Sequence, residues 1–189
     1  MVVLETRDVS YRRCGSTALR RVSVAVVRGE LLAVCGPPGA GTSALLRVLG
    51  GASPPDAGRV VRHAGRARFT RGSDAAATAL DATEPGSVLL LDHPAEPDAD
   101  EDSVLGRARW AAERGAAVVV STHDLGLAAR HAHTAALLVA GRLVAWAEPA
   151  VAFVPAVRLL GYAGSFPAET VTGWEARTAV ERTHLRVAG

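Results

Sequence analysis

The sequence predicts an α/β fold organised around a mainly parallel β-sheet. Segments typical of strands alternate with segments typical of helices along most of the chain, which is the pattern of α/β proteins. Three strand segments, at 31–35, 87–91 and 116–121, are almost entirely apolar, as expected for strands that are covered on both faces. The 189 residues are enough for one domain with a hydrophobic core.

Each further element rests on a local pattern of apolar and polar residues. The segments expected to form strands are, in order, 2–9, 21–28, 31–35, a pair at 59–62 and 66–70, 87–91, 116–121, 134–139 and 142–146. The segments expected to form helices are 43–49, 73–82, 103–114, a stretch around 125–132, and a last one near 175–185.

The boundaries between these elements carry residues that favour turns and loops. Cys14-Gly15-Ser16 predicts a turn between the first two strands, and Pro-Pro-Asp-Ala-Gly at 54–58 interrupts the chain after the first helix. The helix at 73–82 is favoured by its alanine content. Residues 94–102 are acidic and contain proline, so we expect a loop there. Gly115 is expected to end the predicted helix at 103–114.

Composition and charge exclude several classes of function. Hydrophobic residues make up 49% of the chain and charged residues 21%, which is the balance of a globular protein. A net charge of +2 argues against nucleic acid as the main partner, because nucleic-acid-binding domains usually carry a basic stripe. No apolar run is long enough to span a bilayer, and no secretory signal is recognisable. Two cysteines make no disulfide framework. We therefore expect a cytoplasmic protein, peripheral at the inner face of the membrane only through a partner.

A glycine-rich loop between a buried strand and a helix is the first candidate site. Glycines in that context let main-chain N–H groups converge on phosphate oxygens, and the N-terminus of the following helix adds about half a positive charge. A plain Gly/Pro turn would also fit the loop taken alone. The residues expected to bind nucleotide are Gly36, Pro37, Pro38, Gly39, Ala40, Gly41, Thr42 and Ser43, the last as a hydroxyl ligand of Mg²⁺.

Several further segments surround this loop in a fixed order. They are Leu4 to Tyr11, Ala18 to Ser23, Arg28 to Leu31, Leu46 to Gly51, Pro54 to Val60, Ala79 to Pro85, Leu89 to Asp92, Val118 to Leu125, and Gly141 to Val144. Their order and flanks resemble the nucleotide-binding subunit of ABC transporters over about residues 2–155. The resemblance implies a P-loop NTPase fold with a RecA-like ABC ATPase core, an antiparallel N-terminal β portion, and ATP and Mg²⁺ as cofactors.

The resemblance also assigns roles to single side chains. Tyr11 matches the aromatic residue that stacks on adenine, although a tyrosine at the edge of the core fits nearly as well. Asp92 matches the Walker B aspartate, which holds Mg²⁺ at the end of a buried strand together with Ser43. His123 matches the switch histidine, which donates a hydrogen bond to the γ-phosphate. His93 follows the aspartate, where the family has a catalytic glutamate.

Two substitutions argue against ordinary hydrolysis of ATP. Thr42 replaces the phosphate-loop lysine, and a charge-assisted hydrogen bond is worth about 1.5–3 kcal/mol, or roughly 10- to 150-fold in affinity. We expect the remaining main-chain amides to bind ATP weakly. The loss of stabilisation should be larger for the transition state of hydrolysis than for bound ATP. His93 replaces a general base whose contribution is about 10²- to 10⁴-fold. The chain contains no lysine or glutamine, and all 21 of its Lys/Arg residues are arginine.

The segment before Asp92 is much shorter than in the family. Asp92 lies 49 positions after Ser43, and the glutamine loop, the helical subdomain and the Leu-Ser-Gly-Gly-Gln signature are not recognisable. Residues 66–70 run almost directly into the helix that normally follows the signature. After Asp92, either Asp98 or Asp100 is a candidate to replace the segment that contacts a second subunit.

The missing signature has a consequence for assembly. The family closes ATP between the phosphate loop of one subunit and the signature of the other. A transport role is therefore expected to require a full-length ABC ATPase, a transporter membrane subunit, or both. The leading hypothesis is an ATP-binding subunit with weak or absent hydrolysis. The alternatives are a non-catalytic regulatory pseudo-ATPase module and a decayed gene product without nucleotide function.

The chain is expected to divide into a nucleotide-binding domain at 1–155 and a C-terminal extension at 156–189 that contains the last helix. Four histidines lack metal-ligand spacing and are expected at solvated positions: His63, His131, His133 and His184. Trp110 and Trp146 are expected in the core, and Cys35 as a small buried apolar residue.

Overall fold

The computed structural model describes residues 1–64, 67–94 and 101–154, and these form two sheets and five helices. The strands are β1 (Val2–Arg13), β2 (Ser16–Val27), β3 (Leu31–Cys35), β4 (Ala57–Arg62), β5 (Ala67–Arg71), β6 (Val88–Asp92), β7 (Ala117–Thr122), β8 (Thr134–Val139) and β9 (Arg142–Ala147). The helices are α1 (Thr42–Gly50), α2 (Ser73–Asp81), α3 (Glu101–Glu113), α4 (Leu125–His131) and α5 (Pro149–Ala152).

The larger sheet has six strands in the order β5-β6-β7-β3-β8-β9. Neighbouring strands are parallel except for β8 and β9, which form an antiparallel hairpin. Every residue of β3, β6 and β7 is buried, which confirms that their apolar sequences belong to strands covered on both faces. The carboxyl ends of the parallel strands meet along one edge, where α/β proteins place their ligands.

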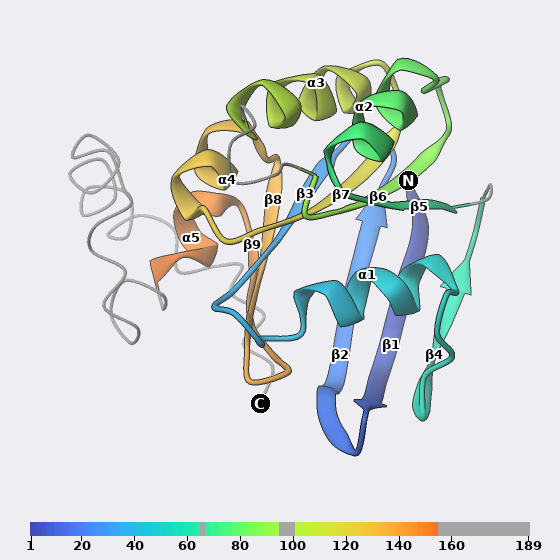
Figure 1. The fold of residues 1–189 in the computed structure, drawn as a ribbon, viewed down its shortest axis with the longest axis vertical. Coiled ribbons are helices and arrows are strands. Elements are labelled where there is room, and N and C mark those ends of the chain that lie inside the picture. Colours follow the sequence, from blue (N-terminus) through green and yellow to red (C-terminus); the bar gives the residue numbers. More distant parts are fainter. Residues whose placement is uncertain (65–66, 95–100, 155–189) are drawn as a thin grey trace.

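Layers of helix and strand cover both faces of the larger sheet (Figure 1). Helices α2, α3 and α4 lie on one face, over a core that includes Ala79, Leu105 and Ala128. Helix α1 lies on the other face, where Leu49 shares a second core with Leu90 of β6 and with residues of the smaller sheet. The fold is therefore the predicted α/β arrangement.

The smaller sheet is antiparallel and has the order β2-β1-β4. It is the N-terminal β portion that the sequence led us to expect. Strands β1 and β2 are longer than predicted and meet in a tight turn at Cys14 and Gly15, both of which have positive φ. The tip of the β8–β9 hairpin joins the two sheets, because the Arg20 N–H donates to the carbonyl oxygen of Gly141 at 2.7 Å.

The prediction that 59–62 and 66–70 pair with each other was wrong. Strand β4 pairs antiparallel with β1 in the smaller sheet, whereas β5 pairs parallel with β6 in the larger one. Closeness in sequence favoured a hairpin, but the side chain of Phe69 packs on α1, which draws β5 to the buried strand β6. The two segments therefore lie in different layers of the fold.

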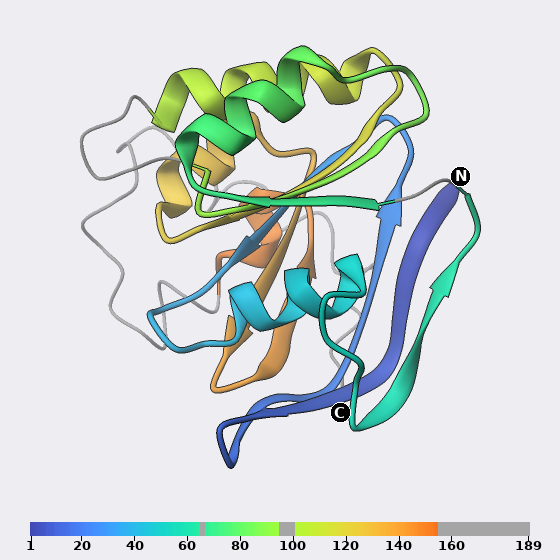
Figure 2. The same ribbon diagram turned by 45° about the vertical axis from the view of Figure 1, so that its right-hand side comes forward.

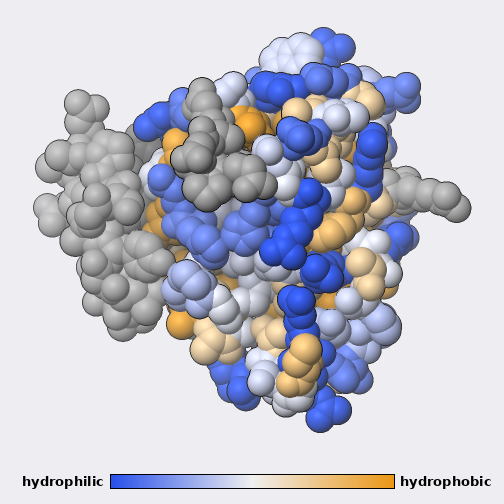
Figure 3. Space-filling view, viewed as in Figure 1, coloured by the Kyte–Doolittle hydropathy of each residue, from blue (hydrophilic) through white to orange (hydrophobic). Residues whose placement is uncertain are grey.

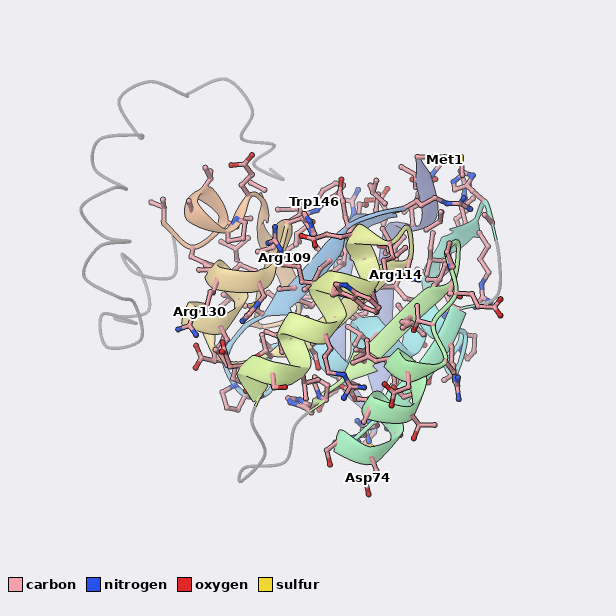
Figure 4. All side chains as sticks on the ribbon, turned by 90° about the horizontal axis from the view of Figure 1, so that it is seen from above. Met1, Asp74, Arg109, Arg114, Arg130 and Trp146 are labelled. Carbon is pink, nitrogen blue, oxygen red and sulfur yellow. The ribbon has the colours of Figure 1, made fainter. Side chains whose placement is uncertain are left out.

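The prediction that Trp110 belongs to the core was also wrong, since this residue is 59% exposed. Helix α3 buries only small or branched side chains, at Leu105, Ala108, Ala111 and Ala112, and Trp110 lies away from them. The guanidinium of Arg114, the residue after the end of α3 that is labelled in Figure 4, lies 4.5 Å from the centre of the Trp110 ring. Trp146 is partly buried against the core on the α1 side of the sheet, in line with its prediction.

The junction between β5 and α2 is short. Strand β5 ends at Arg71 and α2 begins at Ser73, so a single residue, Gly72, connects them. Helix α5 has no counterpart among the predicted elements. The predicted domain boundary at 155/156, the extension at 156–189 and the helix near 175–185 lie outside the described residues.

The described surface carries no extended apolar area on the face seen in Figure 3, where hydrophilic and apolar residues alternate over short distances. Within the described ranges, no helix combines the length and apolar character that a membrane crossing requires.

Candidate functional site

The glycine-rich loop connects the buried strand β3 to the first residue of α1. Gly36 directly follows the strand and is buried, and Gly41 precedes the helix in a left-handed conformation with φ 103°. No side chain caps this helix N-terminus. The first N–H groups of a helix have no partners within it, so the loop presents main-chain donors and the positive end of the helix dipole.

Two glycines of the loop have no room for a side chain. A Cβ at Gly36 would overlap the carbonyl oxygen of Leu138, and one at Gly41 would overlap the carbonyl oxygen of Ala18. The loop thus packs closely against both β8 and β2. These contacts explain why the chain needs glycine at these positions, independently of any ligand.

The tip of the β8–β9 hairpin also contacts the glycine-rich loop through a main-chain hydrogen bond. The N–H of Gly141 donates to the carbonyl oxygen of Ala40 at 3.0 Å, and a turn within the loop joins Ala40 N–H to Pro37 at 2.9 Å. Pro38 and Gly39 lie at the exposed tip. Main-chain hydrogen bonds therefore fix the shape of the loop on the side that faces the hairpin.

Tyr11 lies at the same corner of the molecule. It pairs in register with Leu19 across the β1–β2 hairpin, next to Ala18, which the loop contacts. Its side chain is partly buried and packs on the core around α1. This position is compatible with either an adenine-stacking residue or a tyrosine at the edge of the core.

Thr42 and Ser43 are the first two residues of α1 and differ in exposure. Thr42 is 5% exposed and contributes to the buried side of the helix. Ser43 is partly exposed and is not among the buried residues of α1. The position of the absent lysine is therefore filled by a short buried side chain that carries no charge.

Asp92 ends β6 with a fully buried side chain. Its Oδ1 accepts a hydrogen bond from the Ser121 hydroxyl at 2.9 Å, and Ser121 is its register partner on β7. Its Oδ2 is buried and has no hydrogen-bond partner among the described residues. The nearest cation to Oδ2 is Arg71, whose Nε lies 3.7 Å away. One carboxylate oxygen is thus held in place and the other remains available to a ligand.

His93 has a strained backbone and a partly buried ring. Its φ is 46°, a left-handed value that is uncommon outside glycine, and its N–H donates to the Ser121 hydroxyl at 2.9 Å. Burial lowers the pKa of His93, the nearby Asp92 and Glu101 oppose this shift, and the His123 ring and the Arg71 guanidinium reinforce it. The ring therefore favours its neutral form, in which one nitrogen can accept a proton.

His123 follows β7 and contacts the phosphate loop directly. Its Nδ1 lies 2.7 Å from the carbonyl oxygen of Gly36. Its ring lies 4.8 Å from that of His93, centre to centre, at an angle of 43°. The structure thus brings together the loop, the neighbouring residues Asp92 and His93, and His123, which lie in three separate segments of the sequence.

Sequence reasoning missed Glu101, the first residue of α3. Its Oε1 accepts a hydrogen bond from the Thr122 hydroxyl at 2.6 Å, and its charge acts on the pKa of His93. The acidic run was the available signal, but the candidates predicted from it, Asp98 and Asp100, lie outside the described residues. Glu101 is the carboxylate of that run that the structure places beside the site.

The oxygen donors at this edge fit a hard divalent cation. Mg²⁺ is usually held by one or two carboxylates together with phosphate oxygens and water. The unpartnered Oδ2 of Asp92 and the hydroxyl of Ser43 supply one carboxylate and one hydroxyl. Among the described residues no group of three or more His, Cys, Asp or Glu side chains could hold a metal by itself. Such an ion would therefore depend on a phosphate ligand.

The histidines predicted to be solvated differ in their exposure. His63 is 42% exposed and contacts Glu5, which agrees with a solvated position. The same prediction was wrong for His131, which is 14% exposed and contacts Asp102, and for His133, whose Nδ1 accepts the N–H of Leu31 at 3.0 Å. His184 lies outside the described residues. Cys35 is fully buried, as predicted.

Solved structures with the same fold are ATP-binding cassettes. An ATP-binding cassette of an ABC transporter in its ADP conformation aligns with a TM-score of 0.64 at 13% identity, over 92% of this chain and 99% of that one. The ATP-binding subunit of another ABC transporter gives a TM-score of 0.60 at 20% identity, with the same coverage. At these identities the likeness establishes the fold of this chain.

Sequence relatives establish the family. The family model described as ABC transporter matches residues 19–80. A hemin import ATP-binding protein of Thermobifida fusca is 30% identical over 243 aligned positions, which cover 90% of this chain and 85% of the relative. That alignment exceeds the 189 residues of the chain, so it opens gaps within it. A zinc import ATP-binding protein of Ruegeria pomeroyi is 41% identical over 86 residues, 46% of this chain and 32% of the relative. The chain belongs to the family of ATP-binding subunits of ABC transporters.

Proposed function

We propose that this chain is the ATP-binding subunit of an ABC import system and holds Mg-ATP with weak or absent hydrolysis of its own. The observation that carries this proposal is the main-chain cradle at Gly41, where a tightly packed glycine loop leads into an uncapped helix N-terminus. Membership in the family implies ATP as the nucleotide. The names of the two relatives above, which specify import of hemin and of zinc, support import as the direction of transport.

The binding chemistry follows from groups at one edge of the sheet. The uncapped N-terminus of α1 would receive the phosphates through main-chain N–H groups. Ser43 and Asp92 would hold Mg²⁺, which when bound neutralises phosphate charge. His123 donates its Nδ1–H to the carbonyl oxygen of Gly36, so its Nε2 would donate to the terminal phosphate only when the ring carries both protons. Tyr11 would lie beside the adenine.

Hydrolysis is expected to be slow because two groups with chemical roles are replaced. Thr42 brings no charge to the developing negative charge of the transition state. His93 is neutral at physiological pH because burial lowers its pKa, so it can in principle accept a proton from water. An imidazole differs from a glutamate in reach and shape, however, and its main chain is strained here.

The direct junction between β5 and α2 supports dependence on a partner. One residue separates these elements, so the segment that carries the helical subdomain and signature in the family has no place there. A homodimer would then lack the surface that closes over bound ATP. A full-length ABC ATPase would supply it, and contact with the membrane would run through that partner or a membrane subunit.

A second candidate function is a nucleotide-binding regulatory module without turnover. The observation that favours it is the combined replacement at Thr42 and His93, which spares the cradle but removes both reactive groups. The two functions differ in whether phosphate is ever released.

Calorimetric titration with Mg-ATP, followed by a phosphate-release assay, tests the proposal. We expect weak but saturable binding by the chain alone and slow release at most. Failure to bind ATP with or without a candidate partner ATPase would refute nucleotide function altogether. Tight binding with no release, even when a full-length partner is present, would favour the regulatory module.

Restoring the family residues gives a sharper test of the partner requirement. The double variant Thr42→Lys, His93→Glu should bind ATP more tightly, by roughly 10- to 150-fold if the lysine makes its charge-assisted bonds. It should still turn over slowly, because closure of the site is not restored. Brisk multiple turnover by this variant alone, or ATP-dependent dimers of the chain alone, would contradict the proposal.

A further inference from the structure

Arg71, the last residue of β5, lies beside the candidate site without having been assigned to it. It pairs in register with Asp92, the last residue of β6. Two residues earlier on each strand, Phe69 and Leu90 both approach Gly50 of α1. Because strand side chains alternate between faces, Arg71 and Asp92 point to the same face of the sheet as Phe69 and Leu90, which is the face that α1 covers.

The direction of α1 places its N-terminus near these two side chains. Figures 1 and 2 both show α1 running opposite to β5, so that the start of the helix lies below the end of the strand. Gly50, the last residue of α1, lies against the side chain of Phe69. The first turn, which contains Ser43, therefore lies toward Arg71 and Asp92.

The guanidinium of Arg71 is charged, accessible and close to the unpartnered carboxylate oxygen. Its Nε lies 3.7 Å from Asp92 Oδ2, too far for a hydrogen bond, and its side chain is 56% exposed. Within the described ranges it makes no hydrogen bond, so its donors are available to a ligand. The positive charge of Arg71 also acts on His93, where it adds to the effect of burial in lowering the pKa of that imidazole.

We infer that Arg71 binds the nucleotide phosphates and supplies the positive charge that Thr42 cannot. This inference rests on the proposed function and identifies a phosphate ligand on β5, outside the phosphate loop. A guanidinium presents a planar fork of donors that suits phosphate oxygens, and it stays charged at all physiological pH values. Arg71 contributes to the affinity for ATP even when divalent cations are removed, because its charge acts on the phosphates directly.

The competing explanation is that Arg71 only neutralises the buried charge of Asp92. The variant Asp92→Asn separates the two roles, since it removes the charge to be neutralised but keeps an acceptor for Ser121. In that background a pure counter-ion has no remaining function. A phosphate ligand does, and removal of the buried carboxylate also protects the fold from an unpaired charge when Arg71 is replaced.

The experiment measures the Kd of a fluorescent ATP analogue in excess EDTA for Asp92→Asn and for the double variant Asp92→Asn, Arg71→Met. We expect the double variant to bind about tenfold more weakly, as for the loss of one charge-assisted contact that is partly solvent-exposed. The matched control is Arg68→Met in the same background. Arg68 lies on the same strand, is exposed, and points to the opposite face.

The possible results distinguish failure of the Arg71 assignment from failure of the proposed ATP binding. Equal Kd values for the Arg71 and Arg68 variants would overturn the assignment of Arg71 while leaving ATP binding intact. A tenfold loss confined to the Arg71 variant would support it, provided that inorganic pyrophosphate also competes more weakly with the analogue for that variant. Absence of binding in the wild-type chain and in Asp92→Asn alike would instead remove the proposed function itself.

Discussion

The imidazole of His123 is tied to the first residue of the phosphate loop, with Nδ1 at 2.7 Å from the carbonyl oxygen of Gly36. A carbonyl oxygen can only accept, so Nδ1 carries the proton in this contact. The end of β7 and the start of the loop are thereby joined although they are 87 positions apart in sequence. The contact orients the ring and limits the positions that the loop can adopt.

Replacing His123 should loosen the loop and weaken nucleotide binding. We expect His123→Ala to raise the Kd for Mg-ATP about fivefold to tenfold, the equivalent of one hydrogen bond worth about 1 kcal/mol. His123→Asn keeps a side-chain N–H near the position of Nδ1 but has no counterpart of Nε2, so it should recover only the part of the affinity for Mg-ATP that depends on the contact with the loop. Calorimetry on the three proteins measures this difference. Identical Kd values for wild type and His123→Ala would show that the contact does not organise the site.

Two glycines of the loop offer a matched pair for testing its packing. Gly39 and Gly41 both have positive φ, at 82° and 103°, but a Cβ at Gly39 would meet nothing within 4 Å, whereas one at Gly41 would overlap Ala18. Gly39→Ala should therefore cost about 1 kcal/mol of unfolding free energy from the backbone alone. Gly41→Ala should cost clearly more and reduce ATP binding. Urea unfolding of the two variants side by side decides this, and equal losses would mean that the loop can move away from β2.

The central strands could be predicted from the sequence because their apolar residues leave few alternatives. Strands β3, β6 and β7 match the predicted runs within about one residue, and Asp92 and His123 follow from the ends of two of them. Strand partners were less predictable. Residues 59–62 and 66–70 are neighbours in sequence, but their pairing depends on the side chain of Phe69 packing against α1, which no local pattern reveals.

The same limit explains which site residues were missed. Arg71 becomes a candidate only through its register with Asp92, and Glu101 only through its bond to Thr122. Both relations join segments that are far apart in sequence, and arginines and acidic residues are common on any surface. Trp110 shows the opposite error, since large aromatic residues favour burial on average but α3 has space only for small side chains on its inner face.

Removing the charge of Asp92 should separate metal dependence from folding. The carboxylate is buried with one unpartnered oxygen, so Asp92→Asn is expected to leave the unfolding free energy unchanged or higher. The same variant should lose the increase in ATP affinity that Mg²⁺ gives the wild type. Titrations with and without Mg²⁺, paired with urea unfolding, measure both effects. A Mg²⁺ effect that persists unchanged in Asp92→Asn would place the cation elsewhere.

The hydroxyl of Thr122 supports the end of β7 through two hydrogen bonds. It donates to Glu101 at 2.6 Å and accepts the N–H of Asp124 at 3.1 Å. Thr122→Val keeps the shape but leaves both partners unsatisfied, which should cost about 1–3 kcal/mol. Thr78→Val on the exposed side of α2 also removes one hydroxyl bond and serves as the control, with an expected cost below about 1 kcal/mol. Chemical unfolding gives both values, and equal costs would mean that water replaces the lost bonds at Thr122.

The stability of the protein should fall in mild acid, and His133 is a defined contributor. Burial lowers the pKa of His133, and its Nδ1 must stay unprotonated to accept the N–H of Leu31. Above the pKa of an unfolded histidine, about 6.5, both states are neutral and there is no effect. As the pH falls through that value the unfolded chain takes up the proton first, so the free energy of unfolding decreases until the folded-state pKa is reached. His93 acts in the same direction, since burial lowers its pKa as well.

His133→Asn tests this contribution, because the asparagine Oδ1 takes about the place of Nδ1 and cannot be protonated. At pH 7.5 the variant should unfold at nearly the same urea concentration as the wild type, since the N–H of Leu31 keeps an acceptor. At pH 5.5 it should be the more stable of the two. A pH dependence that is the same in both proteins would mean that His133 takes up its proton equally in the folded and unfolded states. Replacing His93 by asparagine in this variant should flatten the remaining slope further, because burial lowers the pKa of His93 in the same way.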